Sequence, residues 1–385
     1  MRLPRPAVPD EHSFSSRLRS PTVSARLGVA VGICFGTAFL TGLLSHYAQL
    51  PHQPVPFPVN PVWGYRVTQG LHVISGTAAI PLLLVKLWSV FPKLFARPPR
   101  RLGLLLVEAA ERVSIAVLVG AAITELATGV ANVAQWYAWD FNFRRSHFAL
   151  AWIAIGAMVV HIAVKLPVIR AALGVDPDAD DAPDAAVTGL TRRGLLRVAW
   201  AGSAVAVLAT GFGTVRGLGR VSVLAARSRD EAEGLPVNRS AVDAGVTATA
   251  TSSAYRLVVS RGSREVALSR EQLLALPQHT QVLPIACVEG WSVDGRWTGP
   301  RIRDLLDLVD APSDSDIVVR SLQQHGPDRV TTLPGNFAGD ERTLLALALN
   351  DEPLALDHGF PARVIAPNRP GALQTKWVAA LEVAT

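Results

Sequence analysis

Long apolar runs are the feature that most restricts the fold of this sequence. They cover about Leu27 to Leu50, Val62 to Phe91, Val113 to Val133, Ser146 to Ile169 and Leu195 to Val215. Each is about as long as the roughly 20 residues that cross a bilayer as a helix. Hydrophobic residues make up 49% of the 385-residue chain and charged residues only 18%, which favours membrane spans joined to a soluble part. We therefore predict an all-α bundle of about five transmembrane helices, followed by a soluble domain.

Composition also divides the chain into segments. The first apolar run is too long for a simple signal peptide and lacks a small-residue cleavage site. We predict a disordered cytoplasmic tail (1–25), a four-helix membrane domain (26–171), an acidic linker (172–191), a fifth transmembrane segment (192–215), a second linker (216–254) and a soluble domain (255–385).

Basic residues near the ends of the runs predict the orientation. The tail, the loop between the second and third runs and the region between the fourth and fifth runs together carry fourteen of them: Arg2, Arg5, Arg17, Arg19, Arg26, Lys93, Arg97, Arg100, Arg101, Lys165, Arg170, Arg192, Arg193 and Arg197. The opposite side has three: Arg66, Arg144 and Arg145. The positive-inside rule then puts the N-terminus in the cytoplasm and the soluble domain outside the cell membrane. Because these arginines act as topology signals, the net charge of +6 does not indicate nucleic-acid binding.

The stretch TRRGLLR precedes the fifth run. It resembles a twin-arginine export signal, here internal and uncleaved, of the kind that exports domains folded around a cofactor. The alternative is that Arg192 and Arg193 are only positive-inside charges.

The soluble domain has short alternating segments. YRLVVS, REVALS, QVLPIAC, DIVVRSL and WVAALEV predict strands, whereas SREQLLAL and RIRDLLDLV predict short helices. RTLLALALN and ARVIAP supply further strands or short helices. The order predicts an α+β domain without βαβ alternation and without a glycine-rich phosphate loop.

Four histidines, His46, His72, His147 and His161, fall in or at the predicted spans, where ionisable residues are functional candidates. His147 and His161 are 14 residues apart, so they share one helix face and lie roughly 21 Å apart along the axis. Imidazole is a common haem ligand, and helix bundles hold cofactors between facing side chains. The pattern favours one or two b-type haems, with His46 paired with His147 and His72 with His161. The alternative is four histidines that only make hydrogen bonds.

Two other residues in the spans have simpler interpretations. Glu125 in the third span could contact a proton or a quinone, but we interpret it as a glutamate near an interface. Cys34 is interpreted as a packing residue. Together, residues 27–170 resemble the four-helix di-haem b-type cytochromes that serve formate dehydrogenases and hydrogenases. The matching feature is the 14-residue histidine spacing, whereas His46 lies nearer the outer end of its span than that family requires.

The other cysteine, Cys287, opens the stretch CVEGWSVDGRWTG. A lone cysteine is usually a small buried hydrophobe. However, IACVEGWSVDGRWTGPRIRDLLDLV resembles the molybdenum-cofactor domain of the sulfite oxidase family, especially its bacterial sulfoxide-reductase branch. The resemblance implies that Cys287 is the catalytic residue and the single protein thiolate on molybdenum, a role that suits a soft ligand. It also implies that Gly290 lets the backbone approach the cofactor, and that Trp291 and Trp297 shield it from water.

The C-terminal stretch DHGFPARVIAPNRPGALQTKWVAALEV resembles the pterin-binding end of the same family, so the resemblance covers about Tyr255 to Val383. It implies that His358, Arg363 and Lys376 hold the pterin and its phosphate, for which Arg and Lys are suitable donors. The alternative for Arg363 and Lys376 is surface charges. The domain is compact for this family, and Arg320 and His325 are only weak candidates for binding a substrate.

These features predict a membrane-bound oxidoreductase that depends on molybdenum–molybdopterin and acts outside the cytoplasmic membrane. Its substrate would be a small oxo-acceptor or oxo-donor, sulfite- or sulfoxide-like, and b-type haem would exchange electrons with the quinone pool or another carrier. Two alternatives are a membrane-anchored binding module that has lost its metal and a histidine-containing transporter or sensor. The sequence leaves open the substrate, the direction of electron flow, the haem number and the oligomeric state.

Overall fold

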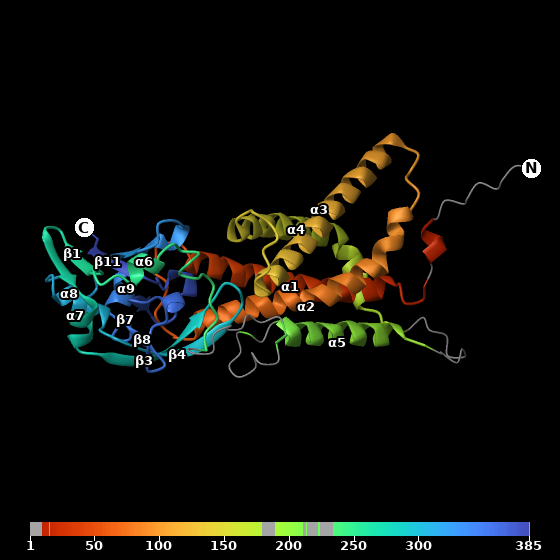
Figure 1. Ribbon diagram of the computed structural model, residues 1–385. Coiled ribbons are helices and arrows are strands. Elements are labelled where there is room, and N and C mark those ends of the chain that lie inside the picture. The colour runs from red at the N-terminus through yellow and green to blue at the C-terminus, as the bar shows by residue number, and fades with distance from the viewer. Residues whose placement is uncertain are drawn as a thin grey trace, which may run out of the picture. The chain divides into compact units, whose positions relative to one another are not determined.

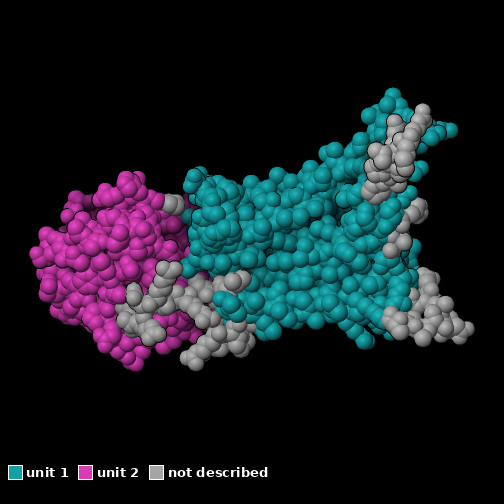
Figure 2. All heavy atoms as spheres, turned by 45° about the vertical axis from the view of Figure 1, so that its right-hand side comes forward, with its two compact units in different colours: residues 1–40, 71–211, 221–224 teal, residues 41–70, 212–220, 225–385 magenta. Residues whose placement is uncertain are grey.

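The computed structural model describes residues 10–14, 16–178, 189–210, 213, 222–223 and 234–384. Most of the acidic linker, the end of the fifth apolar run and the start of the second linker lie outside these residues. The chain forms two compact units (Figure 2): residues 1–40, 71–211 and 221–224 in one, and residues 41–70, 212–220 and 225–385 in the other. The division falls within the helices α1 and α2.

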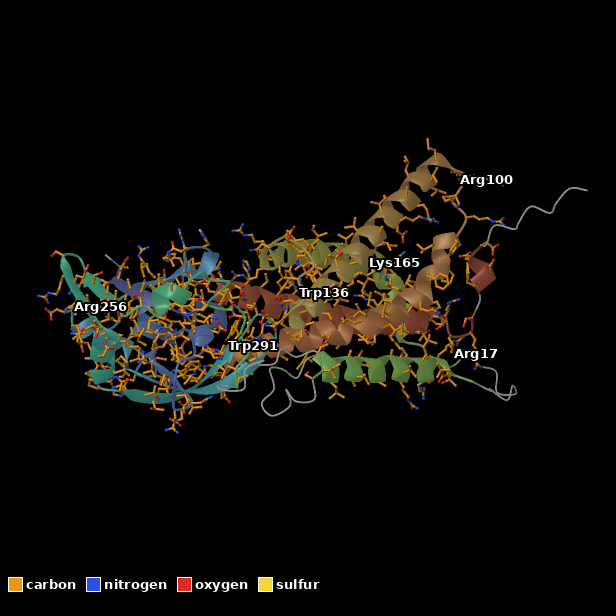
Figure 3. The ribbon with its side chains drawn as sticks, in the orientation of Figure 1. Arg17, Arg100, Trp136, Lys165, Arg256 and Trp291 are labelled. Atoms are coloured by element: carbon orange, nitrogen blue, oxygen red, sulfur yellow. The ribbon has the colours of Figure 1, made fainter. Side chains whose placement is uncertain are left out.

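The first unit is helical, as predicted (Figure 1). After the short 3-10 helix η1 (Glu11–Phe14), its elements are α1 (Pro21–Ala48), α2 (Gly64–Val90), the 3-10 helix η2 (Phe91–Phe95), α3 (Leu102–Val133), α4 (Phe143–Leu173) and α5 (Arg192–Thr210). Within this unit Arg17 and Arg100 lie toward one end and Trp136 toward the other (Figure 3).

Four helices, rather than the five predicted, are long and apolar enough to cross a membrane among the described residues. They are Pro21–Ala48, Gly64–Phe95, Leu102–Val133 and Phe143–Leu173. Helix α5 is not among them, because Arg192, Arg193 and Arg197 lie within its first six residues. The residues directly after Thr210 lie outside the described part of the chain. Leu195 and Ala199 of α5 are nevertheless buried against α1 and α2.

The second unit contains three small sheets, in agreement with the predicted α+β class (Figure 1). The five-stranded sheet has the order β2 (Arg264–Leu268), β1 (Leu257–Arg261), β11 (Val378–Val383), β5 (Ile317–Ser321), β6 (Val330–Leu333). In it β1 and β11 are parallel and the other neighbours antiparallel. The four-stranded sheet has the order β3 (His279–Ala286), β4 (Ser292–Gly299), β8 (Ala348–Leu349), β9 (Glu352–Pro353), and β10 (Arg363–Ile365) pairs with β7 (Leu344–Ala346).

Short helices complete this unit. They are α6 (Thr247–Ala250), α7 (Arg270–Ala275), α8 (Ile302–Asp307) and α9 (Gly335–Ala338), with 3-10 turns η4 (Pro327–Arg329), η5 (Leu356–His358) and η6 (Gly371–Leu373). Ser269 caps α7 in a capping box with Gln272, which explains why the helix begins there.

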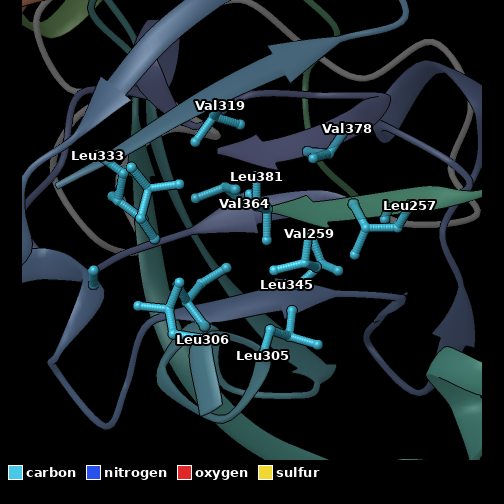
Figure 4. Packing of buried hydrophobic residues seen from close by; sticks show 14 of the residues in the cluster. Leu257, Val259, Leu305, Leu306, Val319, Leu333, Leu345, Val364, Val378 and Leu381 are labelled. Atoms are coloured by element: carbon cyan, nitrogen blue, oxygen red, sulfur yellow. The ribbon is translucent and has the colours of Figure 1, made fainter. Parts of the chain in front are cut away.

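The main core lies between the five-stranded sheet and α8 (Figure 4). Alternate residues of the strands, such as Leu257 and Val259, are fully buried and pack with Leu305 and Leu306. A second cluster contains Leu235, Cys287 and Trp297. Residues 234–254, assigned to a linker from the sequence, therefore contribute to the domain, since Leu235 is only 1% exposed.

Candidate functional site

Cys287 lies at the tip of the β3–β4 hairpin. The last strand pair joins Ala286 to Ser292. The turn is closed by two backbone hydrogen bonds, from Cys287 N to Trp291 O (2.9 Å) and from Gly290 N to Cys287 O (3.1 Å). Gly290 has a φ of 78°, in the left-handed region that favours glycine. This requirement of the turn is a local reason for the glycine beside the cysteine.

Glu289 lies beside the thiol. Its Oε2 accepts hydrogen bonds from Trp291 Nε1 (2.9 Å) and from Cys287 Sγ (3.6 Å). The side chains are buried, with only 3% of Cys287 exposed. Burial, and secondarily the charge of Glu289, raises the pKa of the Cys287 thiol well above its usual value. A free thiol here stays protonated, so metal binding must displace its proton. Nothing in the sequence predicts a role for Glu289, although it lies within the motif that begins at Cys287.

One pocket brings together five of the residues predicted to lie around the pterin cofactor, but not Gly290 or Trp297. Cys287, Trp291, His358, Arg363 and Lys376 line it. They come from the β3–β4 hairpin, from η5, from β10 and from the residue two before β11. Arg320 does not belong to this group, because it lies on β5 and pairs with Glu382 (2.6 Å).

The cations of the pocket are held by backbone oxygens. Lys376 Nζ donates to Arg239 O (2.6 Å) and to Asp357 O (2.9 Å), and Arg363 Nη1 donates to His358 O (3.1 Å). Arg363 and Lys376 are 6% and 9% exposed, which argues against ordinary surface charges. Burial, followed by the charge of Arg363, lowers the pKa of Lys376 to about 7. Burial and the two cations lower the pKa of His358 to about 4.

These shifts describe a pocket of positive potential. Each cation makes protonation of the neighbouring side chains less favourable. A bound anion would offset this repulsion between positive charges. A buried thiol together with buried anion-binding donors is the donor set that a metal–pterin phosphate cofactor requires. The residues present therefore fit the molybdopterin group.

The membrane histidines form a second candidate site. In the first unit the ring centroids of His72 and His147 are 6.1 Å apart, at an interplanar angle of 74°. His72 Nδ1 lies 2.8 Å from Ala38 O, and His147 Nε2 lies 3.1 Å from Glu125 Oε2. His72 thus adjoins His147 rather than the predicted partner His161. His46 belongs to the other unit.

Glu125 is buried within the helices at 8% exposure, which differs from the predicted interface position. Its Oε1 has no hydrogen-bond partner among the described residues. Across all the residues that the structure describes, no group of three or more His, Cys, Asp or Glu side chains is placed to hold a metal ion. A lone cysteine or a histidine pair suits cofactors that bring their own ligands, as a pterin dithiolene or a porphyrin does.

Comparison with known proteins identifies the C-terminal domain. Residues 244–385 match the family described as "Oxidoreductase molybdopterin binding domain". The chain is similar to the mitochondrial sulfite oxidase of Drosophila melanogaster, with 30% identity over 155 residues, covering 34% of this chain and 27% of the relative. The identity with "Uncharacterized oxidoreductase YuiH" of Bacillus subtilis (strain 168) is 32% over 116 residues, covering 30% of this chain and 57% of the relative.

A third relative is "Putative protein-methionine-sulfoxide reductase subunit YedZ1" of Azospira oryzae. The identity is 33% over 132 residues, covering 34% of this chain and 49% of the relative. In each case the chain spans less than two thirds of the relative. The match supports the predicted molybdopterin domain, whereas the cytochrome b-like resemblance stays a prediction.

Proposed function

Since its C-terminal domain is of the molybdopterin-binding oxidoreductase type, we propose that the chain is a membrane-bound molybdenum–molybdopterin oxidoreductase that exchanges electrons with the quinone pool through b-type haem. The observation that carries this proposal is the convergence of Cys287 with Arg363 and Lys376 on one buried pocket. We propose a small sulfite- or sulfoxide-like substrate, because two of the relatives are a sulfite oxidase and a putative methionine-sulfoxide reductase subunit.

In this proposal the protein residues hold the cofactor and control its surroundings. Arg363 and Lys376 bind the anionic pterin phosphate, His358 donates to it, and Trp291 walls the pocket from water. When bound, the cofactor supplies two-electron oxygen-atom chemistry at a metal joined to the Cys287 thiolate. Glu289 accepts hydrogen bonds beside that sulfur and fixes the Trp291 indole.

The histidine pair supports the haem half of the proposal. A metal-binding histidine usually has its second ring nitrogen bonded to a carbonyl or carboxylate. His72 meets this condition through its Nδ1, which lies 2.8 Å from Ala38 O. The ring centroid of His147 lies 6.1 Å from that of His72. Because His147 Nε2 lies 3.1 Å from Glu125 Oε2, the ring must turn away from Glu125 before this nitrogen can bind a metal. A bound haem would carry single electrons across part of the roughly 30 Å bilayer.

We also propose that the cofactor domain lies outside the cytoplasm. Residues 41–70, external by the distribution of Lys and Arg, form one unit with residues 225–385. Within it Thr332 N donates to Pro51 O (3.2 Å) and Asn336 Nδ2 to Phe57 O (2.9 Å). The chain must then cross the membrane once more after α4.

We propose that α5, which is less apolar than the four candidate spans, makes this crossing together with the residues that follow it. Its 19 residues span roughly 28 Å at about 1.5 Å per residue, close to the bilayer thickness. It runs beside the bundle, with Arg192 Nε donating to Arg17 O (2.7 Å) and Ser203 Oγ to Ala78 O (2.8 Å).

Protease treatment of intact spheroplasts tests this orientation. We expect an epitope after Thr385 to be removed by external protease, whereas an epitope before Arg17 survives until the cells are lysed. Protection of both epitopes would contradict the crossing by α5 and put the domain in the cytoplasm.

Metal analysis with a reduced-minus-oxidised spectrum of the detergent-purified protein tests the proposed function. We expect about one molybdenum and one or two b-type haems per chain. Haem without molybdenum would favour the binding module that has lost its metal. The absence of both would favour the transporter or sensor.

A further inference from the structure

The C-terminal end of α1 and the N-terminal end of α2 pack against the cofactor domain and belong to the same compact unit. Within the unit formed by residues 41–70 and 225–385, Ala48 and Tyr65 pack with Ala286, the last residue before Cys287. Tyr65 N donates to Asn368 Oδ1 (2.6 Å), and Asn368 Nδ2 donates to Pro58 O (2.6 Å). These contacts join segments some 300 positions apart in the sequence.

A chain of hydrogen bonds runs from this packing to the cysteine turn. Tyr65 Oη lies 3.0 Å from Ser45 Oγ, which donates to Gln69 Oε1 at 3.0 Å. Because the Ser45 proton is used in that bond, Tyr65 is the donor to Ser45. Gln69 Nε2 then donates to Val288 O (3.2 Å), the carbonyl directly after Cys287. Ser45, Tyr65 and Gln69 are 6%, 1% and 3% exposed.

Arg66 adds a second contact to the same hairpin. Its Nε donates to Ser292 Oγ (2.7 Å), and its guanidinium forms an ion pair with Asp294. Arg66 and Gln69 are three residues apart in α2, so they lie on one face of the helix. This face therefore holds both sides of the turn that carries Cys287.

We propose that Gln69 is a positioning residue for Cys287, which holds the backbone of the cysteine turn through the Val288 carbonyl and is itself oriented by Ser45 and Tyr65. The proposal extends the role of Cys287 in the proposed function. Loss of the Gln69 donor removes one of the bonds that hold the part-buried Val288 carbonyl. The carbonyl can then move or admit water, and either change displaces the neighbouring sulfur. Small displacements of a reacting group have large effects on catalysis.

Alkylation of Cys287 tests the proposal without any cofactor. The full chain would carry Cys34→Ala, so that Cys287 is the remaining cysteine, and be produced without molybdate. Gln69→Leu keeps the size but removes the donor, and we expect the rate of iodoacetamide reaction to rise about tenfold. The control is Thr68→Val, because among the described residues the Thr68 hydroxyl bonds to Gly64 O of its own helix. Equal rates for the two variants would overturn the proposal.

A milder variant protects the test against misfolding. Tyr65→Phe removes the hydroxyl that bonds to Ser45 and accepts from Gln49 Nε2 (3.2 Å), but leaves Gln69 in place. We expect its rate to lie between those of the control and of Gln69→Leu. If Gln69→Leu does not fold, Tyr65→Phe decides alone. An alkylation rate of Tyr65→Phe equal to that of Thr68→Val would contradict the role of these hydrogen bonds in holding the cysteine turn.

The loaded enzyme provides an independent readout. We expect the Mo(V) electron paramagnetic resonance signal of Gln69→Leu to shift relative to Thr68→Val, because the metal–sulfur geometry changes. An unchanged signal would overturn the positioning role. If the parent chain takes up no molybdenum, the proposed function fails, while the alkylation rates still decide the role of Gln69.

Discussion

Replacement of Cys287 by serine should abolish turnover while leaving the haem spectrum intact. A serine hydroxyl is a hard donor that stays protonated at neutral pH, so it cannot replace a soft thiolate on a redox-active metal. The pocket around it keeps Arg363 and Lys376, which lie on other elements. We therefore expect the pterin to remain bound while the rate falls by about 10³-fold or more.

Substrate turnover with an artificial electron carrier would measure this loss. The matched control is Cys34→Ala, because Cys34 packs against a cluster of apolar residues in the helical unit. That variant should keep the parent rate and the parent molybdenum content. Substantial activity in Cys287→Ser would show that the Cys287 thiolate is not a required ligand of the metal. The assignment of the pocket to molybdenum would then be wrong.

The sequence predicted best those features that local pattern determines. The alternation of YRLVVS and WVAALEV predicted strands that became β1 and β11, because period-two burial is a property of each strand itself. Length and hydropathy likewise identified the four candidate spans. Helix α5 shows the limit of that reasoning, since its three arginines reduce the apolar length without preventing it from packing beside α1 and α2.

The site divides in the same way. Motif resemblance named Cys287, Trp291, His358, Arg363 and Lys376, and these five residues line one pocket. It could not name Gln69 or Leu235, which reach the site through tertiary packing and carry no local signal. Periodicity put His147 and His161 on one face of a helix. It could not say which neighbouring helix faces each of them, and His72 adjoins His147.

Because His72 adjoins His147, we predict that His147→Ala and His72→Ala each remove the same b-type absorption band. Two imidazoles that share an iron are both required for a low-spin b-type spectrum. Their ring centroids are 6.1 Å apart, so the two side chains are near enough that both would hold one haem iron. A reduced-minus-oxidised spectrum of each purified variant would measure the band.

Two further variants separate ligation from packing. Glu125→Gln keeps the shape of the side chain beside His147, so the band should persist. If His147 only bonded to Glu125 and did not bind iron, no band would depend on His147. In His147→Gly, added imidazole should restore the band by filling the space of the lost ring. An unchanged spectrum in His147→Ala would show that this histidine does not bind iron. Loss of a separate band in His161→Ala would instead indicate a second haem, because His161 lies roughly 21 Å along α4 from His147.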